Sequence, residues 1–300
     1  MPHLASSRCC RVLVILLGAC GGDDGGDGGG GGGGNPASVT LVSRTWTQPA
    51  SSESYQCREI QATSDLLITG FQPMLPAGQF RMWVVTSSAP TNPTPGDFEC
   101  ALDTLAAPGN RLIYAAGLGT NDIDFPSGVG VRVRSGQYVT LILHLVNVQG
   151  TTLSGTSGVT ARTTSQLSTE ADMILGGTLS LNIQPSGSSI GTGDCVAPTG
   201  WNLVALLPMG NALATHHTVE LVHGAPTTLH DAIYDFNQQR FYLVNTTVAQ
   251  GDTIRVTCSY TNPRNSVVHF GPLANDEVCF TGLYRTPAPA TAENPISCLL

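Results

Sequence analysis

The segment Val256-Thr257-Cys258-Ser259-Tyr260-Thr261-Asn262, together with the later segment Asn275-Asp276-Glu277-Val278-Cys279-Phe280, decides the fold. In the first segment β-branched and aromatic residues surround a cysteine, and Gly251-Asp252 stands before it as a turn signal. The second segment begins with turn-forming residues and ends on an apolar run that also holds a cysteine. Short runs of this kind between turn residues are typical of antiparallel strands. The two segments therefore indicate β-structure near the C-terminus.

The same pattern extends over most of the chain. Short β-branched or aromatic runs, broken by Gly and Pro, occupy residues 65–71, 80–87, 128–134 and 137–148. No window shows a sustained helical period, and a second strand-rich block covers residues 171–300. Residues 150–170, rich in Thr, Ser and Gly, are interpreted as a linker or a long crossing loop. We predict an all-β chain with two tandem antiparallel β-sandwich (jelly-roll-like) domains, residues 37–165 and 166–300.

Composition limits the classes of partner. Of the 300 residues 41% are hydrophobic, which is enough to bury a core in each predicted domain. The charged fraction is 11%, with 13 Arg, no Lys and a net charge of −8. Because phosphate binding depends on clustered Lys and Arg, we expect no nucleic-acid partner.

The N-terminus has the features of an export signal. Arg8 and Arg11 precede an apolar run, residues 12–17, which is too short to cross a bilayer. Leu17-Gly18-Ala19-Cys20 resembles the lipobox of bacterial lipoproteins. We predict a lipoprotein signal peptide over residues 1–19, lipid on Cys20, and a Gly/Asp tether through residue 36. The alternative is an ordinary secretory signal in which Cys20 is incidental. A lipid-anchored chain would lie in the bacterial cell envelope, at the outer membrane or cell surface, with the membrane as a partner.

Cysteine usage agrees with export. Cys9 and Cys10 would leave with the signal peptide, and six cysteines remain after Cys20: Cys57, Cys100, Cys195, Cys258, Cys279 and Cys298. An even number in an oxidising compartment indicates three disulfides, for which spacing alone allows about fifteen connectivities. None of the six forms a CxxC pair, so we expect no zinc site built from cysteine.

Several segments, in this order, resemble one family. They are residues 112–117, 125–130, 138–147, 206–215 and 233–243, with the two cysteine segments quoted above. They resemble the copper type II ascorbate-dependent monooxygenases, the peptidylglycine alpha-hydroxylating and dopamine beta-monooxygenases (the PHM/DBH fold). The resemblance implies disulfides Cys57–Cys100, Cys195–Cys298 and Cys258–Cys279. It also implies copper as cofactor and hydroxylation of a C–H bond with O2 and ascorbate.

The resemblance also implies two coppers that face each other across a water-filled cleft. Three imidazoles would hold the first copper, and two imidazoles and a thioether the second. The six positions that it assigns, called here the family ligand positions, are Phe80, Arg81, His144, Met209, Asn211 and Val278. His144 is the only match. Met209 and Asn211 are weak donors, Val278 has no lone pair, and the cationic Arg81 repels a metal ion.

Three interpretations of function follow. The favoured one is a pseudoenzyme: a non-catalytic binding or structural lipoprotein without copper, with a ligand in the interdomain cleft beside Phe80, Arg81, Trp83, Met209 and Asn211. The second is an active copper monooxygenase with His144 among its ligands. The alternative role for His144 is that of a hydrogen-bonded core residue.

The third interpretation is a single-site metal-binding surface protein that uses the region of His216, His217, His223 and His230. On a strand, His216 and His217 point to opposite faces, and His217 and His223 share a face about 20 Å apart. His230 across a hairpin would leave a two-imidazole site. Asp235, Asp252, Asp276 and Glu277 are interpreted as turn residues.

Overall fold

The computed structural model describes residues 37–299, which are all-β apart from a short 3-10 helix, η1 (Leu102–Ala106). The predicted signal peptide, Cys20 and the tether lie outside the described residues and stay predictions. Within the described part of the chain, no helix is both long and apolar enough to span a membrane. The predicted all-β class is confirmed.

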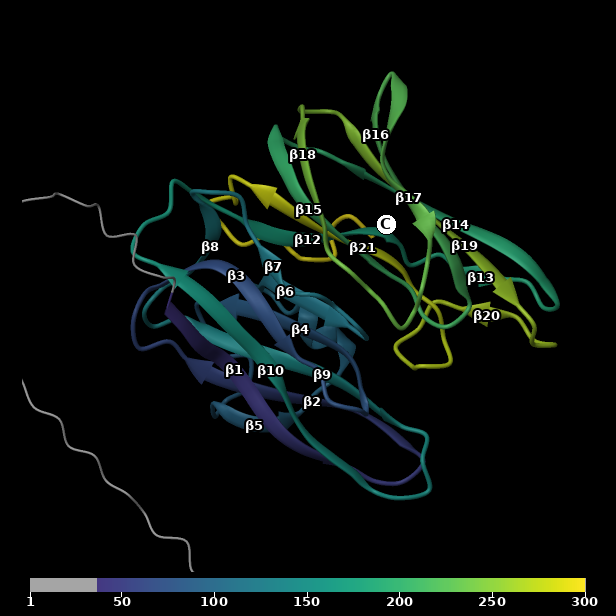
Figure 1. The fold of residues 1–300 in the computed structure, drawn as a ribbon, viewed down its shortest axis with the longest axis horizontal. Helices are drawn as coiled ribbons and strands as arrows, with labels where there is room; N and C mark the ends of the chain where they lie inside the picture. The colour runs from purple at the N-terminus through teal and green to yellow at the C-terminus, as the bar shows by residue number, and fades with distance from the viewer. Residues whose placement is uncertain (1–36, 300) are drawn as a thin grey trace, which may run out of the picture. The chain divides into compact units, whose positions relative to one another are not determined.

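One six-stranded sheet is built from residues 37–170, called here the first half of the chain, and residues 171–299 are called the second half (Figure 1). Its strands, in spatial order, are β1 (Ala37–Gln48), β10 (Leu153–Thr164), β3 (Leu66–Met74), β8 (Val129–Val133) and β11 (Thr169–Glu170), with β7 (Ile123–Asp124) beside β3. Neighbours are antiparallel except β8 and β11, which are parallel.

The prediction of a linker or loop over residues 150–170 was wrong, because β10 runs through that segment and pairs with β1 and β3. Small residues in β10 let its neighbours approach. A Cβ atom at Gly158 would lie 2.4 Å from the backbone oxygen of Val42. Ser157 Oγ accepts a hydrogen bond from Trp46 Nε1 at 2.8 Å. The Thr, Ser and Gly content therefore reflects close strand packing rather than a solvated loop.

A nine-stranded sheet runs through both halves. The second half supplies β18 (Tyr242–Val248), β15 (Trp201–Met209), β21 (Cys279–Thr286) and β12 (Asp172–Thr178). The first half continues it with β6 (Arg111–Gly117), β4 (Gln79–Ser87), β9 (Tyr138–Asn147), β2 (Ser52–Gln61) and β5 (Gly96–Glu99). The halves meet at β12 and β6, where Met173 pairs with Leu112.

A four-stranded antiparallel sheet completes the second half. Its order is β14 (Gly187–Val196), β19 (Thr253–Asn262), β16 (Ala214–His223) and β17 (Ala225–Ile233). β13 (Asn182–Ile183) pairs with β20 (Val268–His269) in a separate two-stranded sheet. In β19 Ile254, Val256, Cys258 and Tyr260 are buried while the residues between them are more exposed, so one face of this sheet covers a core.

The hydrophobic core of the first half continues into the second. Met209, Phe280 and Tyr284 belong to the same buried cluster as the first-half strands. The Tyr284 hydroxyl donates to the backbone oxygen of Ile113 at 2.7 Å. Residues 36–300 form one compact unit. The shared hydrophobic core therefore holds the two halves together. The predicted domain division at residue 165 stays a prediction.

Three disulfides cross-link the strands and loops of this unit. They join Cys57 to Cys100, Cys195 to Cys298, and Cys258 to Cys279. These are the pairs that the family resemblance implies.

A buried ion-pair network fixes the C-terminal segment. Arg285 Nε lies 2.9 Å from Asp172 Oδ1, and Arg285 Nη2 lies 2.6 Å from Glu293 Oε2. We expect Asp172→Ala to lower the free energy of unfolding by about 3–5 kcal/mol, because it leaves a buried guanidinium without its main partner. Denaturant unfolding measures this change. Arg58→Ala, which breaks the exposed pair with Asp97, should cost at most about 1 kcal/mol. Equal losses in both variants would contradict the account.

Candidate functional site

Five of the six family ligand positions come together between the halves. Phe80, Arg81, His144, Asn211 and Val278 line one small cavity. It has a volume of about 10 Å³, room for about one water molecule. Met209 lies outside this lining, fully buried in the core. A larger ligand would enter only if these side chains moved apart.

Arg81 is the central residue of this contact. Its side chain is buried, and its Nη2 donates to the backbone oxygen of Gly210 at 2.9 Å and to Asn211 Oδ1 at 3.1 Å. The rings of Phe80 and Trp83 lie about 6 Å from the guanidinium carbon (5.8 and 6.0 Å). Burial lowers the pKa of Arg81, yet a guanidinium stays charged at neutral pH. A fixed cation therefore lies among the predicted family ligand positions.

Glu277 fixes the position of Asn211 through hydrogen bonds to the backbone. The Asn211 backbone N–H donates to Glu277 Oε2 at 2.9 Å, and the Leu213 N–H donates to Oε1 at 2.6 Å. The Asn211 side-chain amide donates to the backbone oxygen of Asp276 at 2.8 Å. Burial raises the pKa of Glu277 to about 7, while these N–H groups and Arg81 act in the opposite direction. Glu277, which the sequence predicts to be a turn residue, here orders the Asn211 loop.

His144 on β9 has its own set of partners. Its Nε2 lies 2.6 Å from Glu53 Oε1, and its ring stacks on Tyr55 with centroids 4.4 Å apart. Burial, and secondly the nearby Arg81, lower the pKa of His144 to about 3. The imidazole is therefore neutral at pH 7 and donates Nε2–H to the carboxylate. It is a hydrogen-bonded core residue, the alternative that the sequence left open.

The same first-half residues hold a loop of the second half. The Tyr55 hydroxyl donates to the backbone oxygen of Pro272 at 2.6 Å, and the Ala274 N–H donates to Glu53 Oε1 at 2.7 Å. Glu53 thus joins His144 to this loop. Neither Tyr55 nor Glu53 belongs to a motif, so the sequence carries no signal for their role.

Copper does not fit the donor set of this contact. The positions supply one imidazole, whose Nε2 is engaged by Glu53, and a buried guanidinium. Across residues 37–299, no group of three or more His, Cys, Asp or Glu side chains is arranged to hold a metal ion. The chemistry of the residues present therefore supports packing and hydrogen bonding between the halves.

The second-half histidines are only partly brought together. The rings of His217 and His230 lie on adjacent strands with centroids 6.2 Å apart. His217 is buried, and its Nε2 donates to the backbone oxygen of Phe280 at 3.1 Å. His216 pairs with Asp231 at 2.5 Å, and His223 pairs with Asp252.

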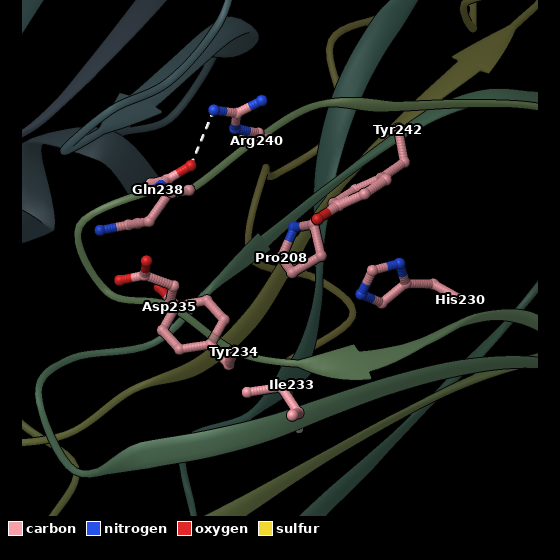
Figure 2. A pocket seen from close by; sticks show the side chains of 9 residues that line it. Pro208, His230, Ile233, Tyr234, Asp235, Gln238, Arg240 and Tyr242 are labelled. Carbon is pink, nitrogen blue, oxygen red and sulfur yellow. Dashed lines mark hydrogen bonds between the residues drawn. The ribbon is translucent and has the colours of Figure 1, made fainter.

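A cavity that the sequence did not indicate lies between β17 and β18, with a volume of about 160 Å³ (Figure 2). His230, Tyr234, Asp235, Arg240 and Tyr242 are among its lining residues. They come from a strand, a loop and a second strand, and no spacing rule connects them. The apolar and aromatic content of residues 233–243 was the only signal in the sequence.

The buried His144 predicts an acid dependence of stability. Its pKa is 6.5 in the unfolded chain and about 3 when folded. Between these values only the unfolded chain binds the proton, so stability falls as the pH falls. In His144→Gln, which keeps an N–H donor for Glu53, the free energy of unfolding should fall less between pH 7 and pH 4, as measured by urea unfolding.

His223→Gln is the control of opposite sign. The hydrogen bond to Asp252 raises the pKa of His223, so this pair adds stability below about pH 6.5 and loses it as the pH rises. Removing this pair should make the free energy of unfolding fall more steeply as the pH falls. An unchanged profile in His144→Gln would contradict the neutral, buried state of His144.

Comparison with known proteins supports the family resemblance in one part of the chain. Several solved structures show weak similarity to the chain. An infectious bursal disease virus Gx strain structure has 10% identity, covers 86% of this chain and 74% of its own, and gives a TM-score of 0.20. A mutant VP2 protein of the same virus has 12% identity, 88% and 74% coverage, and a TM-score of 0.19. The stem and receptor binding domain of spike protein P1 from bacteriophage PM2 has 10% identity, 82% and 97% coverage, and a TM-score of 0.16. These low scores carry no argument about fold or function.

No curated protein matches the chain. Residues 208–289 match the family model described as copper type II ascorbate-dependent monooxygenase, C-terminal domain. The matched segment contains Met209, Asn211 and Val278, three of the family ligand positions. The predicted resemblance to the copper type II ascorbate-dependent monooxygenases is therefore confirmed over residues 208–289.

Proposed function

We propose that the chain is a non-catalytic, surface-anchored lipoprotein that uses the two-domain monooxygenase fold as a binding or structural module. The observation that carries the proposal is the buried Arg81 guanidinium, which donates to Gly210 and Asn211 between the halves. A cation at that place disfavours a metal ion. Its hydrogen bonds give the contact a structural role instead.

The contact around Arg81 supports a stable connection between the halves. Family chemistry would need imidazoles at five positions and a thioether at the position of Val278, whereas the side chains present supply one imidazole, His144, and no donor at Val278. A protein that hydroxylates a C–H bond with copper would also need open space between the halves, where about 10 Å³ is found. A ligand in this cleft remains part of the proposal, and it would have to separate Arg81 from Asn211.

The proposed location is the bacterial cell envelope, with the chain attached to a membrane through lipid on Cys20. The Leu17-Gly18-Ala19-Cys20 sequence and the following Gly/Asp tether support this attachment. The six paired cysteines agree with an oxidising compartment.

A copper titration tests the loss of the metal sites. With residues 36–300, disulfides formed, we expect equilibrium dialysis against Cu(II) to leave no more bound copper than in the His144→Ala variant. Weak binding to exposed imidazoles would be equal in both. Two tightly held type II coppers per chain by electron spin resonance, both reducible by ascorbate, would overturn the proposal.

Lipid attachment has a separate test. The full chain, expressed in a Gram-negative host with a labelled fatty acid, should carry the label and sediment with membranes. Cys20→Ser should abolish both, because the acceptor thiol is absent. Cys10→Ser is the matched control and should retain both. Label on the Cys20→Ser chain would refute the anchor.

A further inference from the structure

The cavity between β17 and β18, called here the Tyr242 pocket, lies where two sheets of the second half end. β17 ends the four-stranded sheet and β18 ends the nine-stranded sheet. Figure 2 shows side chains from both strands, and from the loop between them, arranged around Pro208. None of the lining residues is a family ligand position. The pocket is therefore a site separate from the Arg81 contact.

Aromatic rings form the walls of the Tyr242 pocket. The rings of Tyr242 and His230 are in contact, with centroids 4.4 Å apart and planes tilted by 50°. Burial lowers the pKa of His230, so this ring is a neutral imidazole at pH 7. Tyr242 remains 39% exposed although it lies beside a cavity. An aromatic surface of this kind is available to a ligand.

Tyr234 adds a rigid wall. Its hydroxyl accepts from the Gly210 N–H at 2.7 Å and donates to the Gly210 oxygen at 2.9 Å. Both hydrogen-bonding functions of the phenol are used inside the protein, so the ring position is fixed before a ligand arrives. Preorganised walls of this kind reduce the entropy that binding would lose.

The loop that carries the polar side chains is also fixed. The Asn237 N–H donates to Asp235 Oδ1 at 2.8 Å, and the Gln239 N–H donates to the backbone oxygen of Leu118 at 2.9 Å. Arg240 Nη2 donates to Gln238 Oε1 at 2.7 Å, the dashed line in Figure 2. The rim therefore presents a carboxylate, an amide and a guanidinium from one ordered loop.

Charge and size restrict the ligand. Asp235 and Arg240 are the only charged lining residues, and their formal charges cancel. Because these charges cancel, the lining gives neither a net anion nor a net cation an overall attraction, and it suits an uncharged ligand. A dry cavity of about 150 Å³ holds a benzene ring, so about 160 Å³ has room for one six-membered ring. The rim supplies both donors and acceptors.

We propose that the Tyr242 pocket binds one pyranose ring of an uncharged carbohydrate. A pyranose has an apolar C–H face, which suits the negative face of the Tyr242 ring. Its hydroxyl groups both donate and accept hydrogen bonds, which suits the mixed set of Asp235, Gln238 and Arg240. This inference goes beyond the proposed loss of copper and does not depend on it.

Binding is tested with the full chain and the methyl glycosides of glucose, galactose, mannose and N-acetylglucosamine, by saturation-transfer NMR and calorimetry. We expect at least one to bind with a Kd of about 1 mM, the affinity expected for a ligand of this size. Tyr242→Ala should weaken that Kd about tenfold through loss of the ring surface. Asp235→Asn should also weaken it, and it keeps the shape of the loop.

Leu243→Ala is the matched control, since Leu243 is the next residue on β18, is exposed and does not line the pocket. It should leave the Kd unchanged. Absence of binding by all four glycosides at about fiftyfold the expected Kd would overturn the proposal. Equal binding by wild type, Tyr242→Ala and Asp235→Asn would also overturn it, as would choline or acetate binding more tightly than every glycoside. Copper bound in the dialysis experiment would leave these outcomes unchanged.

Discussion

The buried guanidinium of Arg81 is the constraint on which the contact between the two halves depends. This contact, in which Arg81 meets Gly210 and Asn211, is called here the junction. A charge taken out of water is costly unless acceptors replace the lost hydration. Here Gly210 and Asn211 provide those acceptors, and both belong to the other half of the chain. Asn211 is in turn ordered by Glu277, so the cation from β4 is connected through Asn211 to a loop and a carboxylate of the second half. The same charge makes the place unsuitable for copper.

The chain resembles the family in part of its sequence but lacks the side chains that the family's copper chemistry needs. Segments 208–289 resemble the C-terminal domain of a copper monooxygenase, yet the side chains at the family ligand positions make contacts between protein groups. Folds are retained more widely than the sites built on them. The polar and aromatic side chains around the Tyr242 pocket show a second place on the same fold where a ligand site can form, on edge strands that the junction does not use.

The sequence alone was sufficient to predict the fold class and the unsuitability of Arg81 for a metal site. Each prediction has a physical reason. Alternating apolar residues such as Val256, Cys258 and Tyr260 predict a strand with one buried face, and the structure buries them. Arg81 could be predicted to exclude a metal from its charge alone. Its hydrogen bonds to residues about 130 positions later could not, because they depend on how the halves pack.

Other features required the structure. Residues 150–170 looked like a loop by composition, although Gly158 and Ser157 serve the close packing of β10 against β1. The roles of Glu53 and Tyr55 depend on a loop of the other half. The Tyr242 pocket arises where two sheets end, and the periodicity of a single strand carries no information about that. The signal peptide and Cys20 lie outside the described residues and rest on the sequence alone.

The most direct test of the central claim is a double-mutant cycle between Arg81→Met and Asn211→Ala, with the free energy of unfolding measured in urea. A hydrogen bond to a charged group in a buried contact contributes about 1.5–3 kcal/mol. If Arg81 joins the halves as described, the two losses will be coupled by at least about 1 kcal/mol. Additive losses, with coupling near zero, would contradict the claim that this contact holds the junction together.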